Sequence, residues 1–82
     1  MKIYQDVDEY EYTKLFSNIT EKVRQIRKSQ SMTQEQLALA IGHTSASMLS
    51  KIEAGLENKH YNIKQLYLIS KVLNVPLSSF FE

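Results

Sequence analysis

The sequence predicts an all-α protein in which five helices form one compact domain. Apolar residues recur at helical spacing in successive segments, and three of these segments follow a residue type that caps helix N-termini. The chain has 82 residues, one proline and two glycines, so it has room for one domain and few interruptions within its helices. We expect no strands.

The first helix is expected over residues 18–29. Asn18 is followed three residues later by a glutamate, a spacing that forms a capping box and starts a helix. Asp8 is followed by a glutamate at the same spacing, so residues 8–16 are either a separate helix or a continuation of the first one. The apolar stripe of this helix contains Ile19, Val23 and Ile26, extended by Leu15 or Phe16 with Tyr12.

Two short helices are expected next. Thr33, followed by Gln36, opens the second helix, and Gly42 ends it because glycine adopts the left-handed backbone conformation at low cost. Residues 42–45 then form a polar turn before a third helix, which stops at Gly55. The side chains expected to face the core are Leu37 and Ile41 in the second helix and Leu49 and Ile52 in the third.

A fourth helix is expected from Ile63 to Leu73. Asn62 and Gln65 form its capping box, and Asn74 is a suitable C-terminal cap. Pro76 fits the first turn of a short last helix. The expected inward residues are Ile63, Leu66, Ile69 and Leu73, and the last helix would return Leu77, Phe80 and Phe81 to the body.

Leu68 and Val72 lie nearly opposite this inward face, so a single core cannot readily cover both sides of the fourth helix. Either the last helix and the N-terminal segment cover them, or a second subunit does. A domain of this size buries only about 60% of the surface that its unfolded chain exposes, which favours dimerisation. We therefore expect a two-fold homodimer whose interface contains Leu68, Val72, Leu77, Phe80 and Phe81.

The net charge of +1 conceals an uneven distribution. Residues 1–16 hold two lysines and four acidic residues, whereas the remaining chain holds eight basic and five acidic residues. We expect residues 1–16 to form an acidic N-terminal arm and residues 17–82 to form the domain. The basic excess of the domain is compatible with nucleic acid as a partner.

Several other functional classes are not expected. The chain has no cysteine, and its two histidines, His43 and His60, have no cluster of carboxylates beside them, so we expect no metal and no cofactor. No arrangement of a nucleophile and a base favours an enzyme, and we expect no small-molecule substrate. The sequence shows no signal peptide or membrane-spanning segment, so we expect a cytoplasmic protein without membrane contact.

Two short capped helices around a tight turn match the DNA-reading helix-turn-helix, in which the second helix enters the major groove. The residues themselves resemble the Xre, or Cro-and-repressor, helix-turn-helix family. The resemblance rests on Ile26-Arg27 and on the segments MTQEQLALAIG, SMLSKIEAG and IKQLYLISKVLNVPLSSFF. It implies a lambda-repressor-like domain that binds double-stranded DNA and regulates transcription.

The family pattern also implies roles for individual residues. Compared with the commonest spacing, this chain has one extra residue between Gly42 and Glu53 and a longer loop after Gly55. Counted back from Glu53, the base-reading positions are Ala46, Ser47, Met48, Ser50 and Lys51. The candidates for contact with the DNA backbone are Thr33, Gln34, Thr44, Ser45 and Lys59.

The family typically pairs an arginine of the first helix with a glutamate of the third. Arg27 and Glu53 occupy these positions, so the resemblance implies a partly buried ion pair that holds the recognition helix in place. The size and ending of the chain resemble controller proteins of restriction-modification systems, and repressors of phages or mobile elements fit nearly as well. The alternative is that the same fold serves as a protein-binding adaptor or antitoxin.

Overall fold

The computed structural model describes residues 8–82 as a helical domain. Its elements are α1 (Glu9–Ser29), α2 (Gln34–Ala40), α3 (Ser47–Ala54), α4 (Ile63–Leu73) and the 3₁₀ helix η1 (Leu77–Phe81). No strand occurs among residues 8–82, so the all-α class is confirmed for this part of the chain. The expected fifth helix is a 3₁₀ segment, which leaves four α-helices.

Helix α1 begins earlier than residue 18. The side chain of Asp8 accepts hydrogen bonds from the backbone N–H groups of Tyr10 (2.9 Å) and Glu11 (3.4 Å), and the helix then continues through Asn18 without a break. Residues 9–16 are therefore a continuation of the first helix, and the expected start at residue 18 is wrong. The rest of the expected acidic arm, residues 1–7, lies outside the described residues.

Reciprocal capping boxes start both α2 and α4. Thr33 Oγ1 accepts from the Gln36 N–H (3.0 Å), while Gln36 Oε1 accepts from the Thr33 N–H (2.9 Å). Asn62 and Gln65 make the same pair of bonds at 2.7 and 2.8 Å. These bonds confirm both predicted starts and satisfy backbone donors that the first helical turn leaves unpaired.

The ends of α3 and α4 have left-handed backbone conformations. Gly55 has φ 70° and Asn74 has φ 56°, and Gly42 has φ 94° in the turn after α2. These positions favour glycine or asparagine because most side chains clash with the backbone there. The predicted ends of α3 and α4 are therefore confirmed.

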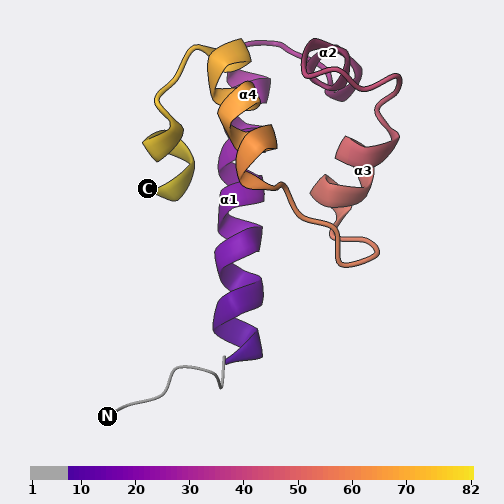
Figure 1. Ribbon diagram of the computed structural model, residues 1–82. Coiled ribbons are helices and arrows are strands. Elements are labelled where there is room, and N and C mark those ends of the chain that lie inside the picture. The colour runs from indigo at the N-terminus through magenta and orange to yellow at the C-terminus, as the bar shows by residue number, and fades with distance from the viewer. Residues whose placement is uncertain (1–7) are drawn as a thin grey trace.

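The elements enclose one core (Figure 1). Helices α1 and α4 contact each other, with α2 and α3 on one side of this pair and η1 on the other, and in this view the N-terminal part of α1 extends beyond the other helices. The buried apolar residues are Ile19, Val23, Leu37, Ala38, Leu49, Ile52, Tyr61, Leu66, Ile69, Leu73 and Phe80.

Ile63, expected to face the core, does not, and Phe81, expected to return to the body with the last helix, is 51% exposed. Ile63 is 66% exposed, whereas Leu66, Ile69 and Leu73 are buried. At 100° per residue, these three side chains fall within about 60° of one another, and Ile63 lies about 60° beyond Leu66. Ile63 therefore lies outside the buried stripe of α4.

Candidate nucleic-acid interface

Helices α2 and α3 contact each other and are joined by a hydrogen-bonded turn at residues 41–46. The N–H of His43 donates to the carbonyl of Ala38 (2.9 Å), and the N–H of Gly42 donates to that of Leu39 (3.1 Å). Ala38 is fully buried, as expected for a small residue that allows two helices to approach closely. The local contacts of the turn therefore determine how α3 is oriented relative to α2.

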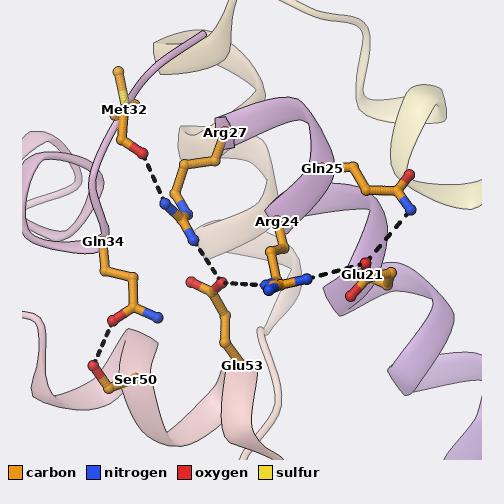
Figure 2. A network of polar contacts seen from close by, with 8 residues as sticks. All are labelled: Glu21, Arg24, Gln25, Arg27, Met32, Gln34, Ser50 and Glu53. Carbon is orange, nitrogen blue, oxygen red and sulfur yellow. Dashed lines mark hydrogen bonds and ion pairs between the residues drawn. The ribbon is translucent and has the colours of Figure 1, made fainter. Parts of the chain in front are cut away.

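A side-chain hydrogen bond joins the first residue of α2 to the middle of α3. Ser50 Oγ donates to Gln34 Oε1 at 2.7 Å, and both side chains are partly buried (Figure 2). This bond adds to the buried side chains of Leu49 and Ile52 in orienting α3, because it turns Ser50 toward the start of α2.

A buried ion pair joins α3 to α1. Arg27 Nη2 donates to Glu53 Oε1 at 2.8 Å, and the two side chains are only 7% and 5% exposed (Figure 2). Arg27 Nη1 also donates to the carbonyl of Met32 at 2.7 Å, in the connection between α1 and α2. The arginine therefore links α1 to α3 and to the connection that precedes α2.

A second arginine approaches the same carboxylate. Arg24 Nε lies 3.7 Å from Glu53 Oε1, and Arg24 Nη1 lies 3.3 Å from Glu21 Oε1. The side chain of Arg24 is 41% exposed, so solvent screens these two contacts more than the buried pair. Glu53 thus neutralises charge from two successive turns of α1.

The phenol of Tyr61 is buried beside this network. Burial raises the pKa of Tyr61 well above its ordinary value of 10.0, the negative charge of Glu53 raises it further, and the positive charge of Arg27 opposes this shift. Among the described residues, the Tyr61 hydroxyl, Arg27 Nε and Glu53 Oε2 have no hydrogen-bond partner. Tyr61 is therefore neutral around pH 7.

Polar and basic side chains gather on the outer side of the turn and α3. Thr44, Ser45, Ser47, Lys51 and Lys59 line a shallow surface cleft there. Lys51 Nζ lies 3.2 Å from Glu57 Oε2, and the side chains of this pair are 39% and 55% exposed. Hydroxyls and ammonium groups in one cleft can bind an anion such as a phosphate.

The two histidines lie in separate parts of the fold. His43 is in the turn before α3, whereas His60 stacks on Phe16 of α1 with 4.1 Å between ring centroids. Residues 8–82 hold no group of three or more His, Cys, Asp or Glu side chains that could bind a metal ion. In the same part of the chain, no helix has both the length and the apolar character that crossing a membrane requires.

The model of the helix-turn-helix family HTH_3 matches residues 23–80, from within α1 to η1. The chain belongs to this family. The segment that matches the family model includes α2, the turn and α3, the elements whose packing is described above.

The fold of this HTH_3 protein is also similar to that of a solved relative. The crystal structure of an HTH_3 family transcriptional regulator from Vibrio cholerae matches with a TM-score of 0.71 and 29% sequence identity, over 84% of this chain and 37% of that chain. The present chain therefore corresponds to less than half of that regulator. No curated protein sequence matches this chain.

The five expected base-reading residues of this HTH_3 protein differ in their surroundings. Ser47 is exposed, and Ala46 and Lys51 are partly exposed. Met48 packs against the core, and its sulfur accepts from Gln65 Nε2 at 3.3 Å, so Met48 is directed partly toward α4. The Ser50 hydroxyl is engaged with Gln34.

Of the expected contacts with the DNA backbone, Thr44, Ser45 and Lys59 line the cleft beside the turn, whereas Thr33 and Gln34 lie at the start of α2. Thr33 caps α2, and Ser45 Oγ accepts from the Ser47 N–H at 3.3 Å, so these two hydroxyls already stabilise helix starts. Thr44 and Lys59 are exposed, and Gln34 is partly buried.

One of the expected dimer contacts is contradicted by the fold. Phe80 is 1% exposed and belongs to the core of the subunit, because η1 packs back onto α1 and α4. The next residue, Phe81, points outward and is 51% exposed. Val72 and Leu77 are partly buried against the same core, and Leu68 is partly exposed.

Three residues of the site were not expected from the sequence: Arg24, Glu57 and Tyr61. Arg24 precedes Arg27 by three residues and so lies on the same side of α1. This spacing could have indicated from the sequence that both arginines approach Glu53. Tyr61 directly precedes the cap of α4, where an apolar residue often packs against the fourth helical residue, here Leu66. Glu57 lies in an irregular loop, and no spacing rule indicates its partner.

Proposed function

We propose that this HTH_3 protein is a sequence-specific regulator of transcription that binds double-stranded DNA as a homodimer. Helix α3 is the recognition helix and enters the major groove, and the operator is an inverted repeat. Family membership and the similarity to a transcriptional regulator support this function, and they favour a binding function over catalysis.

The observation that carries the proposal is the pair of polar contacts that fix α3 to α1 and α2 on its inner side. The Arg27–Glu53 pair anchors it to α1, and the Ser50–Gln34 bond anchors it to α2. A recognition helix that is already oriented loses little conformational freedom when it enters the groove. The buried pair thus fixes the position of α3, and with it the position of the side chains on its outer face.

The polar groups of that outer face have distinct roles. Ser47 and Lys51 are the principal base-reading residues, because a lysine recognises guanine and a hydroxyl can donate to or accept from a base edge. Ala46 contacts a thymine methyl group, and Met48 and Ser50 contribute less because both are engaged within the protein. With so few polar readers, the shape of the DNA provides part of the selectivity.

Contacts to phosphates position the protein on the duplex. Gln34 Oε1 accepts from Ser50, so the amide nitrogen of Gln34 is left as the donor for a phosphate oxygen. Thr33, Thr44, Ser45 and Lys59 provide further contacts on the same side. None of these groups reads a base, so they contribute affinity that is independent of sequence.

The homodimer forms through the outward side chains of α4 and η1, which contact each other in the subunit. Leu68, Leu77 and Phe81 contribute most of the interface, and Val72 contributes its exposed part. A two-fold axis through this surface places two α3 helices about one turn of DNA apart.

Selection of bound duplexes from a random library, at low and at near-physiological salt, tests this function. An enriched inverted repeat with half-site centres about 10 base pairs apart is the expected result. Retention without enrichment, at low salt alone, would indicate binding to phosphates without base reading. No retention at either salt concentration would overturn the proposal in favour of the protein-binding adaptor or antitoxin.

A further inference from the structure

Three aromatic rings connect the N-terminal part of α1 to the loop after α3. Phe16 stacks on His60 with 4.1 Å between centroids and 15° between ring planes. Tyr12 meets the Phe16 ring edge to face, with 4.9 Å between centroids and an angle of 84°. We call Tyr12, Phe16 and His60 the aromatic bridge. Two of its members precede residue 23, where the match to the family model begins.

The loop at residues 56–60 needs support because its backbone is unusual. Glu57 and Asn58 both have φ 55°, in the left-handed region, which asparagine adopts readily but glutamate does not. At the start of the loop, the Leu56 N–H donates to the carbonyl of Lys51 at 2.9 Å, which ties the loop to α3. At its end, the buried Tyr61 holds the chain in the core, and the stack of His60 on Phe16 ties the residue before it to α1.

Lys59 lies between these two attachments and reaches the polar cleft. It lines the same cleft as Thr44, Ser45 and Lys51, directly before the stacked His60. The Lys59 N–H donates to the carbonyl of Leu56 at 3.2 Å, and Tyr61 is buried in the core, so both ends of this segment are held. His60 itself is exposed, so without the stack Lys59 and His60 would sample more positions, and binding a phosphate would then require ordering of both residues. The stack therefore places this cation in the cleft before any ligand arrives.

We infer that the aromatic bridge is a positioning device for Lys59: it holds the loop so that Lys59 contacts a DNA phosphate beside α3. The inference rests on the proposed DNA-binding function and assigns a role to the part of α1 that precedes the family match. Phe16 and His60 are positioning residues and act through Lys59. The first turn of α1 carries Glu9 and Glu11 after the Asp8 cap, and these acids would be repelled by a duplex. This charge favours action through the loop over direct contact by α1.

The inference is tested by the salt dependence of affinity for duplex DNA in the wild type, Lys59→Ala, Phe16→Ala and the double variant. Loss of one phosphate contact lowers the slope of log affinity against log salt by about 0.9 per subunit and weakens binding by up to about tenfold at 0.1 M salt. Phe16→Ala is expected to produce most of this loss. In the double variant, the second substitution is expected to add almost nothing, because both act on one contact.

A pair of substitutions at the exposed His60 separates positioning from general stability. His60→Phe keeps an aromatic ring for the stack and is expected to retain the wild-type slope, whereas His60→Ala is expected to lose it. Tyr10→Ala is the matched control, since it removes an aromatic side chain of α1 that is 74% exposed and outside the bridge. Thermal unfolding of each variant reports any loss of the fold separately.

The possible outcomes separate the two proposals. If the wild type binds DNA but Phe16→Ala and His60→Ala keep its salt slope, the positioning role is wrong and the proposed function stands. Additive losses in the Phe16→Ala, Lys59→Ala double variant would likewise overturn the inference. A wild type that binds no duplex at any salt concentration overturns the proposed function, and the inference with it.

Discussion

Arg27 Nη2 and Glu53 Oε1 lie 2.8 Å apart, and less than a tenth of either side chain is exposed, at 7% and 5%. The two residues are 26 positions apart in the chain and belong to α1 and α3. This contact therefore holds α3, the proposed recognition helix, against α1. Stability and DNA binding should respond together when it is changed.

Glu53→Gln is expected to destabilise the domain by roughly 3–5 kcal/mol, because Arg27 would be left buried without its counter-charge. Urea unfolding followed by circular dichroism measures the free energy of unfolding. The matched control is Glu21→Gln, which removes an exposed partner of Arg24 and should cost about 0–1 kcal/mol. If both variants lower the free energy of unfolding by the same small amount, the buried pair does not stabilise the fold.

Gln34→Ala and Lys51→Ala are expected to weaken DNA binding in different ways. Gln34 is assigned to a phosphate, so its loss should lower affinity evenly across duplex sequences. Lys51 is assigned to a base, so its loss should cost about 1–3 kcal/mol on the best site and relax the preference at one base pair. Titrations against the operator and its single-base-pair variants distinguish these patterns, and the same loss of preference from both variants would contradict the assignment.

Glu57→Gln is expected to strengthen DNA binding. Glu57 holds the ammonium group of Lys51 at 3.2 Å, and its negative charge faces an incoming duplex. Removing that charge frees Lys51 and should raise affinity by about two- to tenfold at low salt, with a smaller gain at high salt. Glu82→Gln makes the same change in net charge beside Asn18 and Lys22, away from the cleft at α3. If both variants gain equally, overall charge rather than Lys51 explains the effect.

Phe81→Glu is expected to convert the proposed dimer into a monomer without unfolding the subunit. The side chain of Phe81 is 51% exposed, so a charge is tolerated in the monomer but not in an apolar interface. Sedimentation at micromolar concentration should show the molecular mass fall by half. Tyr10→Glu, on the far part of α1, should remain dimeric. A wild type that is monomeric both free and on DNA would show that the dimer proposal is wrong.

The domain is expected to lose stability in alkaline solution through Tyr61. Burial raises the pKa of Tyr61 above its ordinary value of 10.0, so the unfolded chain loses this proton at a lower pH than the folded one. The free energy of unfolding therefore has its full contribution from the protonated Tyr61 below about pH 10. It declines as the pH rises further, by at most about 1.4 kcal/mol per pH unit. Denaturant unfolding between pH 8 and 11 should show a steeper decline for the wild type than for Tyr61→Phe. The exposed-residue variant Tyr10→Phe should follow the wild type.

The parts of this fold that depend on local chemistry could be predicted from the sequence. Thr33 with Gln36 and Asn62 with Gln65 are signals within four residues, and each start appears in the structure as a pair of hydrogen bonds. The left-handed ends at Gly55 and Asn74 are equally local. The start of α1 was ambiguous because Asp8 and Asn18 both satisfy the same rule, and the sequence provides no way to rank them.

The parts that depend on packing were predicted less well. Phe80 and Phe81 are chemically alike and adjacent, so only the orientation of η1 decides which one is buried. Met48 fits a base-reading position by count, but its sulfur is drawn to Gln65 seventeen residues away. The family pattern led to Arg27 and Glu53, whereas the stack of Phe16 on His60 obeys no spacing rule because it joins a helix to an irregular loop.

The short length of α3 has a consequence for how new DNA preferences can arise. Of its eight residues, Leu49 and Ile52 form core, Glu53 is ion-paired, Met48 is packed, Ser50 is bonded to Gln34, and Ala54 is exposed but apolar. Ser47 and Lys51 are left as the polar positions that can be exchanged without disturbing the interior. A library randomised at these two codons should therefore yield folded proteins with altered operators, while randomising Leu49, Ile52 and Glu53 should yield mainly unfolded ones.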